Sequence, residues 1–468
     1  MDKNFYARLH NEQVESWRAL QVLRDLLNEV ETVRDITSFK DLEKFVTQRH
    51  EDTLEQFSRY VKMRQDGSPR LMFTDILHAK WYLVQISPTK IVDGVWLKGV
   101  QPLTNNDNVE IENIKNILTN IYLEECGMMS GSKKLLIGNG NHIEIYRKLL
   151  NQMFQYPVND ISGIINHPFL DNNRDDLFVT GCIQQCLALC TKELLPEIIG
   201  YNLCYEQIAL HLMITDYELK ELGIDSTYFN LHLTIDNFHC GHAREALHAA
   251  KDLLTFSKNP ANDLDRIMKG FQLSNLGVDG MKLANDYKLE NVIAQLMEGK
   301  GRVSWSLHAN ILGLEDILKT GTGKDILHYL ENNGYFSSST LENTKFYEML
   351  QKTMVGTFTV DELDYIRAYL LKRLGEKSMN KIPDSKIDIC NLIQRAINKH
   401  DKILMTHPYT GETDTMKNWF QRDQNDFLLC ISSPHMKQRT LDSFLEGRMR
   451  NVRMSEDEKR NLFHWLRS

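Results

Sequence analysis

Two histidines and an aspartate are spaced so that one helix could present them together. They are His232, Asp236 and His239, in the segment 226–250, which reads STYFNLHLTIDNFHCGHAREALHAA. At 100° per residue, with His232 at zero, Asp236 lies at about 40° and His239 at about −20°, so the three project from an arc of about 60°. Imidazole nitrogen and carboxylate oxygen are ligands that iron, manganese and zinc accept. The segment therefore predicts a metal-binding face on one helix.

The alternative for this segment is a helix at a polar seam, where water and backbone groups satisfy both histidines. Tyr228, Ala243 and Ala250 extend the same stripe, and small and aromatic neighbours favour a face that is turned inward. Unpaired charges are costly to bury, and a metal ion supplies the compensation. His242 lies at about −80°, off the arc. It is interpreted as a residue beside the site, unless a local distortion of the helix makes it a ligand.

Further acidic residues occupy positions that call for a positive partner. Glu206 is the only acid in the apolar segment 198–215, and Glu124 and Glu125 end an expected helix just before a Gly- and Lys-containing loop. His142 begins the helix after that loop. The candidate metal ligands are Glu125, His142, Glu206, His232, Asp236 and His239. Six such residues suit two ions that share a carboxylate. No catalytic residue beyond these ligands is predicted.

Three other chemistries are less well supported by the sequence. Cys182, Cys186 and Cys190 share one helix stripe, but free cysteine is more often a small buried residue than a metal ligand. The segment 319–325, KTGTGKD, resembles a phosphate-binding loop, yet it has Asp325 where such a loop needs Ser or Thr. The sequence contains no GxSxG elbow for a nucleophile.

The elements that position these residues are predicted to be helices. Apolar residues recur at helical spacing, for example over 12–30 and 40–62, and alternating strand-like runs are few. The fold class is therefore all-α. Three regions are expected: an N-terminal helical lead-in over 1–65, a main domain over 66–335 that holds every candidate ligand, and a C-terminal helical region over 336–468.

Composition and charge exclude several functional classes. The chain has 468 residues, of which 42% are hydrophobic and 25% charged, as in ordinary globular proteins. Its 55 Lys and Arg residues against 63 Asp and Glu residues give a net charge of −8, so nucleic acid is not an expected partner. The sequence has no apolar run of membrane-spanning length and no apolar core of a signal peptide near its start. No membrane association and a cytoplasmic location are therefore expected.

Four passages resemble a known family. They are SPTKIVDGVWL, EECG with the following GNGNH, GYNLCYE, and YFNLHLTIDNFHCGHA, which together cover about residues 75–250. This combination resembles the heme-oxygenase-like diiron oxidases and oxygenases, also called iron-containing redox enzymes. The resemblance implies a seven-helix, heme-oxygenase-like bundle without heme for the domain at 66–335, with additional N- and C-terminal helical regions. It implies two iron ions per chain, cycling between Fe(II) and Fe(III), with O2 as co-substrate.

The resemblance also implies roles for individual residues. His232, Asp236 and His239 correspond to the ligands of the third core helix, and Glu206 to the carboxylate of the middle helix. Glu125 and His142 correspond to the first ligand pair. Sixteen residues separate that pair here, more than is usual in the family, so the choice between Glu124 and Glu125 is left open.

The expected reaction is O2-dependent desaturation, cyclisation, hydroxylation or C–C cleavage of a small amino-acid-like substrate. The sequence has no flavin or nicotinamide signature, so a separate reductase or the substrate itself supplies electrons. A fatty-acid-type oxidative decarboxylase is one alternative. A non-enzymatic helical interaction module with structural His and Asp is another, and heme oxygenase itself fits six clustered ligands poorly.

Overall fold

The protein is helical throughout most of the part that the structure describes. The computed structural model describes residues 1–31, 35–100, 109–127, 141–236, 238, 241–300, 321–337, 344–346, 358–373, 404–406 and 413–415. The first helices are α1 (Lys3–His10), α2 (Ser16–Glu29), α3 (Phe39–Gln65), α4 (Ile76–Lys90), the 3-10 turn η1 (Val95–Leu97), α5 (Val109–Glu125), α6 (His142–Met153), α7 (Ile161–Ile165) and α8 (Asp176–Leu189). The later helices are α9 (Leu195–Tyr205), α10 (Leu210–Glu221), α11 (Thr227–Ile235), α12 (His242–Phe256), α13 (Pro260–Leu273), α14 (Gly280–Asn285), α15 (Leu289–Lys300), α18 (Gly323–Asn332) and α20 (Val360–Arg373).

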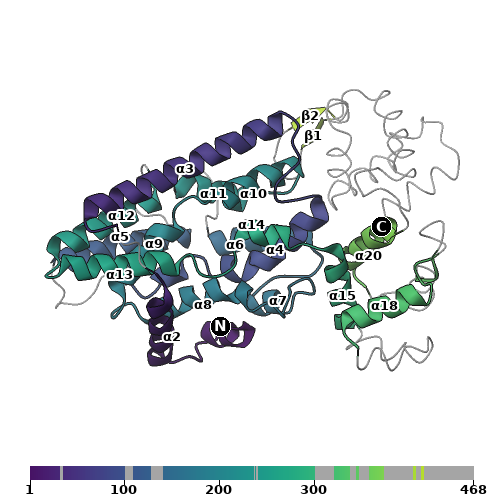
Figure 1. The fold of residues 1–468 in the computed structure, drawn as a ribbon, viewed down its shortest axis with the longest axis horizontal. Helices are drawn as coiled ribbons and strands as arrows, with labels where there is room; N and C mark the ends of the chain where they lie inside the picture. Colours follow the sequence, from purple (N-terminus) through teal and green to yellow (C-terminus); the bar gives the residue numbers. More distant parts are fainter. Residues whose placement is uncertain are drawn as a thin grey trace.

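The expected all-α class is confirmed, with one small addition. Two short strands, β1 (Leu404–Thr406) and β2 (Thr413–Thr415), pair in antiparallel orientation. Helices α1 and α2 pack on α8, while the long helix α3 runs along the other side of the bundle against α10 and α12 (Figure 1). Helix α15 packs against α18 and α20 at one end of the molecule (Figure 1). Among the helices of the described residues, none combines the length and apolar character needed to cross a bilayer.

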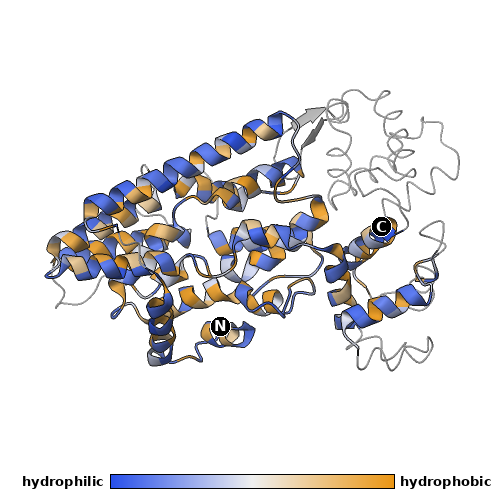
Figure 2. Cartoon of the chain, viewed as in Figure 1, coloured by the Kyte–Doolittle hydropathy of each residue, from blue (hydrophilic) through white to orange (hydrophobic). Residues whose placement is uncertain are grey.

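The burial of each helix follows its residue pattern. The outer helix α3 carries hydrophilic and hydrophobic residues on different faces (Figure 2), and buries residues such as Leu42 and Val46. The central helix α9 is apolar, and every residue from Pro196 to Cys204 is buried. It crosses α13 closely because Gly200 and Gly270 face the other helix: a Cβ on either would lie within 2.0 Å of a backbone oxygen there. This crossing holds α9 against α13, and α9 leads to Glu206 at its C-terminal end.

The expected single helix over 226–250 is interrupted, and this corrects the sequence analysis. Helix α11 ends at Ile235 and α12 begins at His242, with Gly241 as its N-cap. Asp and Gly have low helix propensity, and a short polar side chain can bond locally instead of supporting the helix. Asp236 follows the last residue of α11, and Gly241 precedes the first residue of α12. The stripe expected to run through Ala243 therefore does not continue from α11.

A buried carboxylate ties α10 to the connection between α3 and α4. The Glu218 carboxylate accepts hydrogen bonds from Tyr60 Oη at 2.6 Å and from the backbone N–H groups of Leu71, Met72 and Phe73 at 2.6–3.1 Å. Glu218 itself is fully buried. One side chain thus satisfies three amides of a segment that has no helix or strand to pair them.

Replacing Glu218 by alanine is expected to lower the free energy of unfolding by about 3 kcal/mol or more, since buried N–H groups lose charge-assisted partners. Urea denaturation measures this change. Glu221→Ala is the control, because Glu221 is more exposed and pairs with Arg64 at 2.6 Å; a loss below about 1 kcal/mol is expected for such a pair. Equal losses in the two variants would contradict the anchoring role of Glu218.

The phosphate-loop-like segment is an ordinary helix start. Thr322 is the N-cap of α18, and its side chain and that of Asp325 form a reciprocal capping box. Glu298 Oε2 accepts a hydrogen bond from the Gly323 N–H at 3.2 Å. Carboxylates therefore accept hydrogen bonds from the backbone N–H groups that would otherwise contact phosphate, in agreement with the interpretation from the sequence.

Candidate metal centre

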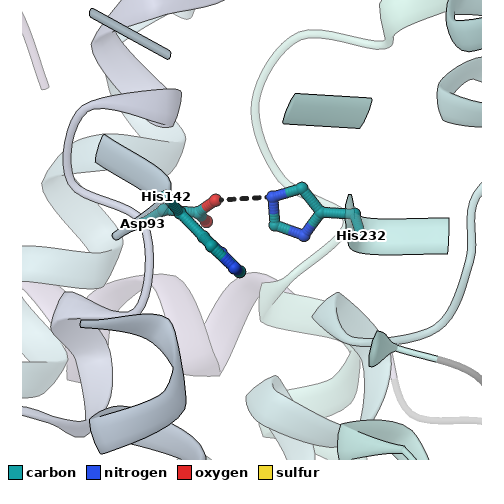
Figure 3. Close-up of side chains that lie close together, drawn as sticks. All are labelled: Asp93, His142 and His232. Atoms are coloured by element: carbon teal, nitrogen blue, oxygen red, sulfur yellow. Dashed lines mark ion pairs between the residues drawn. The ribbon is translucent and has the colours of Figure 1, made fainter. Parts of the chain in front are cut away.

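One group of potential ligands is formed by Asp93, His142 and His232. All three side chains are buried, and each offers an atom within 4.8 Å of the others. Figure 3 shows the Asp93 carboxylate facing the His232 ring, with the His142 ring beside them; His232 Nε2 lies 3.2 Å from Asp93 Oδ2. The residues come from the α4–η1 connection, the first position of α6 and the last turn of α11. We call this group the first cluster.

A second group, the second cluster, consists of Glu125, Glu206, Asp236 and His242. His242 is central to it. Its Nδ1 lies 3.1 Å from Glu125 Oε1, 3.2 Å from Asp236 Oδ1 and 3.5 Å from Glu206 Oε2. Glu125 is the last residue of α5, Glu206 and Asp236 are the C-caps of α9 and α11, and His242 begins α12. Four helix ends therefore meet at this cluster.

The two clusters adjoin each other through two carboxylates. Glu125 Oε2 lies 2.5 Å from His142 Nδ1, and Asp236 Oδ2 lies 2.8 Å from His232 Nδ1. The rings of His142 and His232 are 4.5 Å apart between centroids. Glu125 and Asp236 thus each contact an imidazole of the first cluster while belonging to the second.

The long separation of Glu125 and His142 in the sequence is closed in space by a backbone pairing. Cys126 and Asn141 form an isolated antiparallel β-bridge, and Asn141 Nδ2 donates to Cys126 O at 3.4 Å. The end of α5 and the start of α6 therefore lie side by side. The structure places Glu125, and not Glu124, in the cluster.

Eight buried nitrogen and oxygen atoms of these residues have no hydrogen-bond partner among the described residues. In the first cluster they are Asp93 Oδ1, His142 Nδ1 and His232 Nε2. In the second they are both Glu125 carboxylate oxygens, Glu206 Oε1, Asp236 Oδ1 and His242 Nδ1. Buried polar atoms are normally hydrogen-bonded, whereas these converge at short distance without hydrogen-bond geometry. Such convergence of imidazole nitrogens and carboxylate oxygens fits metal ligation.

Other atoms of the same side chains hold them in place. His242 Nε2 pairs with Glu124 Oε2 at 3.2 Å, so the opposite ring nitrogen points toward the second cluster. Tyr228 Oη donates to Asp93 Oδ2 at 2.5 Å. Metal-binding imidazoles and carboxylates are commonly oriented in this way through the atom that does not bind the ion.

Electrostatics at the centre favour added positive charge. Burial alone would lower the pKa of His232, but the Asp236 and Asp93 carboxylates outweigh it and raise that pKa to about 10. The pKa of His242 is also raised against the effect of burial, by the negative carboxylates around it. Burial and the nearby Asp236 charge raise the pKa of Glu206 well above its usual value. Carboxylates at this density repel one another unless cations lie between them.

The structure brings together five of the six residues proposed from the sequence. Glu125, Glu206 and Asp236 lie in the second cluster, and His142 and His232 in the first. His239, the sixth, lies outside the described residues. Whether any of these residues binds iron stays a prediction.

Two cluster residues were missed or placed elsewhere by the sequence analysis. His242 was placed beside the site, with a local distortion of the helix as the condition under which it would be a ligand. The break between α11 and α12 is such a distortion, and the His242 ring lies in the second cluster. Asp93 was not proposed at all, although it lies in one of the passages that carry the family resemblance. Asp93 is the only acid in the apolar segment 76–100, the same signal that identified Glu206.

The cysteine stripe is part of the core. Cys182, Cys186 and Cys190 are buried in or just after α8. Burial raises the pKa of Cys182 to about 12 and that of Cys190 to about 11, which disfavours the thiolate that a metal would need. Among the described residues, these thiols join no group of potential metal ligands.

Removing the hydroxyl group of Tyr228 tests the orienting contact on Asp93. Tyr228→Phe is expected to weaken iron binding by about 10–100-fold, as the loss of an orienting partner does in metal sites. A chelator competition titration measures this. Tyr146→Phe is the matched control, because Tyr146 is a buried neighbour whose Oη donates to Leu83 O at 2.6 Å, away from both clusters. Wild-type affinity in Tyr228→Phe would show that the contact does not support the site.

Comparison with known proteins agrees with this donor set. No curated protein and no solved structure matches the chain. The family model described as iron-containing redox enzyme matches residues 80–275, a range that contains every residue of both clusters. Residues 80–275 therefore match the iron-containing redox enzyme family, and this match supports an oxidoreductase.

Proposed function

We propose that the two clusters hold two iron ions and that the protein uses them with O2 to oxidise a small amino-acid-like molecule. The observation that carries the proposal is the convergence of eight unpartnered, buried nitrogen and oxygen atoms in two adjoining groups. The family match supports iron and redox chemistry over the same residues. The number of ions and the use of O2 follow from the donor set and from the family resemblance.

Each cluster has the donors for one ion. Asp93, His142 and His232 would hold the first ion. Glu125, Glu206, Asp236 and His242 would hold the second. Two ferrous ions held there would supply two electrons for the reduction of O2, and hard to borderline oxygen and nitrogen donors suit both iron oxidation states.

The chain's own residues would shield the two ions from bulk water. The seven cluster side chains are all buried, and Tyr228 packs against the first cluster, with its ring centroid 4.6 Å from that of His232. The Tyr228 hydroxyl holds its proton toward Asp93. Exclusion of water protects reactive species from side reactions before they meet the substrate.

Polar groups near the centre support a small, polar substrate. Tyr205 Oη and Asn202 Nδ2 are buried and have no hydrogen-bond partner among the described residues. Both lie on the last turn of α9, next to Glu206. These groups would orient a substrate with hydrogen-bonding atoms better than an alkyl chain, which favours an amino-acid-like molecule over a fatty acid.

A separate reductase or the substrate would return electrons to the centre.

Oxygen uptake tests the proposed function. The full chain, purified without chelators and loaded with two equivalents of Fe(II) under argon, should consume O2 when it is admitted and give a transient visible absorption. The same chain loaded with Zn(II) should do neither, because zinc has no accessible second oxidation state. Turnover of a substrate under strict anaerobiosis, or its restoration by zinc alone, would contradict the proposal. Heme absorbance or a stable metal-free fold that takes up no iron would do so as well.

A further inference from the structure

A buried tyrosine adjoins the residues of the first cluster. Tyr228, in the first turn of α11, is fully buried. Its Oη donates to Asp93 Oδ2 at 2.5 Å, and its ring centroid lies 4.6 Å from that of His232 and 6.4 Å from that of His142. Tyr228 and His232 are four residues apart on one helix, so their side chains share a face. The phenol is therefore held against the three residues that are proposed to bind the first ion.

Asp93 offers this phenol a base. A phenol that loses an electron becomes strongly acidic, and its proton passes to a neighbouring base. Asp93 Oδ2 already accepts the hydrogen bond of the Tyr228 hydroxyl, while Asp93 Oδ1 is buried without a partner among the described residues and stays available to an ion. The Lys90 ammonium group lies 5.5 Å from the Tyr228 ring centroid and disfavours a positive charge on that ring. An electron and a proton would therefore leave Tyr228 together.

The geometry lets both particles move without a change of net charge on either side. The electron would go to an ion held beside Asp93, and the proton to the Asp93 carboxylate. The ion and its ligands together thus keep their charge, and Tyr228 stays neutral. Uncompensated charge is costly to create in a buried site. The contact between Tyr228 and Asp93 avoids that cost.

Two other tyrosines each have only one half of this arrangement. The Tyr146 ring lies 4.8 Å from that of Tyr228, but its Oη donates to the backbone oxygen of Leu83 at 2.6 Å, and a backbone carbonyl is too weak a base to take the proton. Tyr60 donates to the Glu218 carboxylate at 2.6 Å, but Glu218 belongs to neither cluster. In the part of the chain that the structure describes, no other tyrosine hydroxyl donates to a cluster carboxylate.

We infer that Tyr228 is a redox-active residue that gives one electron and one proton to the iron centre after O2 has oxidised it. This inference rests on the proposed function and adds a reacting residue to the same site. The O–H bond of Tyr228 breaks, the proton forms a bond to Asp93 Oδ2, and the electron reduces iron that O2 has oxidised. A neutral phenoxyl radical remains. In a single turnover, two ferrous ions supply two of the four electrons that convert O2 to water, Tyr228 supplies the third, and an external reductant supplies the fourth.

Electron paramagnetic resonance tests the inference. The full chain is loaded under argon with an excess of Fe(II), which also serves as the external reductant, and is frozen at successive times after O2 is admitted. Wild type should give the signal of an organic radical. Protein grown with ring-deuterated tyrosine should give a narrower signal, because the ring hydrogens split the signal of a tyrosyl radical. Tyr228→Phe should lower the signal per bound iron at least ten-fold.

Tyr146→Phe and Tyr60→Phe are the matched controls and should keep the wild-type signal. The first removes a phenol near the centre that has no carboxylate acceptor, and the second removes a phenol that has a carboxylate acceptor outside both clusters. A full signal in iron-loaded Tyr228→Phe, or its loss in either control, would overturn the inference. So would a signal that deuterated tyrosine leaves unchanged. If Tyr228→Phe does not fold or load iron, the deuterated wild type and Tyr146→Phe still decide.

Failure of the proposed function is recognised separately. Iron content and O2 uptake are measured on each preparation. A wild-type chain that does not bind two irons, or that binds them and consumes no O2, contradicts the proposed function. A loaded chain that consumes O2 but forms no tyrosyl radical at any time contradicts the role of Tyr228 alone.

Discussion

Asp236→Ala is expected to abolish iron binding at both clusters while the helices remain folded. Asp236 Oδ1 lies in the second cluster, 3.2 Å from His242 Nδ1, and Oδ2 orients the ring of His232 in the first at 2.8 Å. One substitution therefore removes a donor from one cluster and an orienting contact from the other. The loss of iron affinity should exceed the loss caused by removal of an orienting partner alone, which is about 10–100-fold. Anaerobic Fe(II) titration measures the affinity, and far-ultraviolet circular dichroism measures the helix content.

Asp216→Ala is the control for this variant. Asp216 is also a buried aspartate, but it pairs with Lys220 at 2.8 Å and belongs to neither cluster. The Asp216→Ala variant should bind iron as wild type does. Full iron loading in Asp236→Ala would remove Asp236 from the ligand set and with it the link between the two clusters.

Gly94→Ala is expected to disturb the metal centre although glycine provides no ligand. Gly94 has φ +75°, and a Cβ there would lie 2.7 Å from Glu125 Cβ. The left-handed backbone costs a non-glycine residue about 1–3 kcal/mol, and crowding in a packed interior typically adds about 1–3 kcal/mol. Because Glu125 must move, iron affinity should fall together with the free energy of unfolding. Urea denaturation of the metal-free chain and iron titration measure the two effects.

Gly67→Ala separates the two causes. Gly67 has φ +88°, and a Cβ there would meet no atom within 4 Å, so this variant carries the backbone strain without the contact to Glu125. It should be less destabilised than Gly94→Ala and should bind iron normally. Equal destabilisation and equal iron affinity in the two glycine variants would show that Gly94 does not shape the site.

The fold class and individual candidate ligands could be predicted from the pattern of residues within short segments. Helical spacing of apolar residues is a property of short segments, and it predicted the all-α class that the structure has. Glu206 was identified because an isolated acid in an apolar helix needs a positive partner, and the structure places it in the second cluster. The same argument applied to Asp93 would have predicted its burial beside His232.

Contacts between segments far apart in the sequence could not be predicted in this way. The approach of Glu125 to His142 depends on the bridge between Cys126 and Asn141, which no helical periodicity encodes. The position of His242 depends on where α11 ends, and a projection at 100° per residue assumes that the helix continues. The expected division into the regions 1–65, 66–335 and 336–468 stays a prediction, since much of the third region lies outside the described residues.

The iron content of the full chain tests the central claim most directly. The chain is titrated with Fe(II) under argon, unbound iron is removed, and the ratio of iron to protein is measured, with Mössbauer spectroscopy to distinguish the sites. The adjoining clusters predict two irons per chain in two distinct ferrous environments, since one cluster offers two imidazoles and one carboxylate and the other one imidazole and three carboxylates. A single iron per chain, or none, would contradict the account.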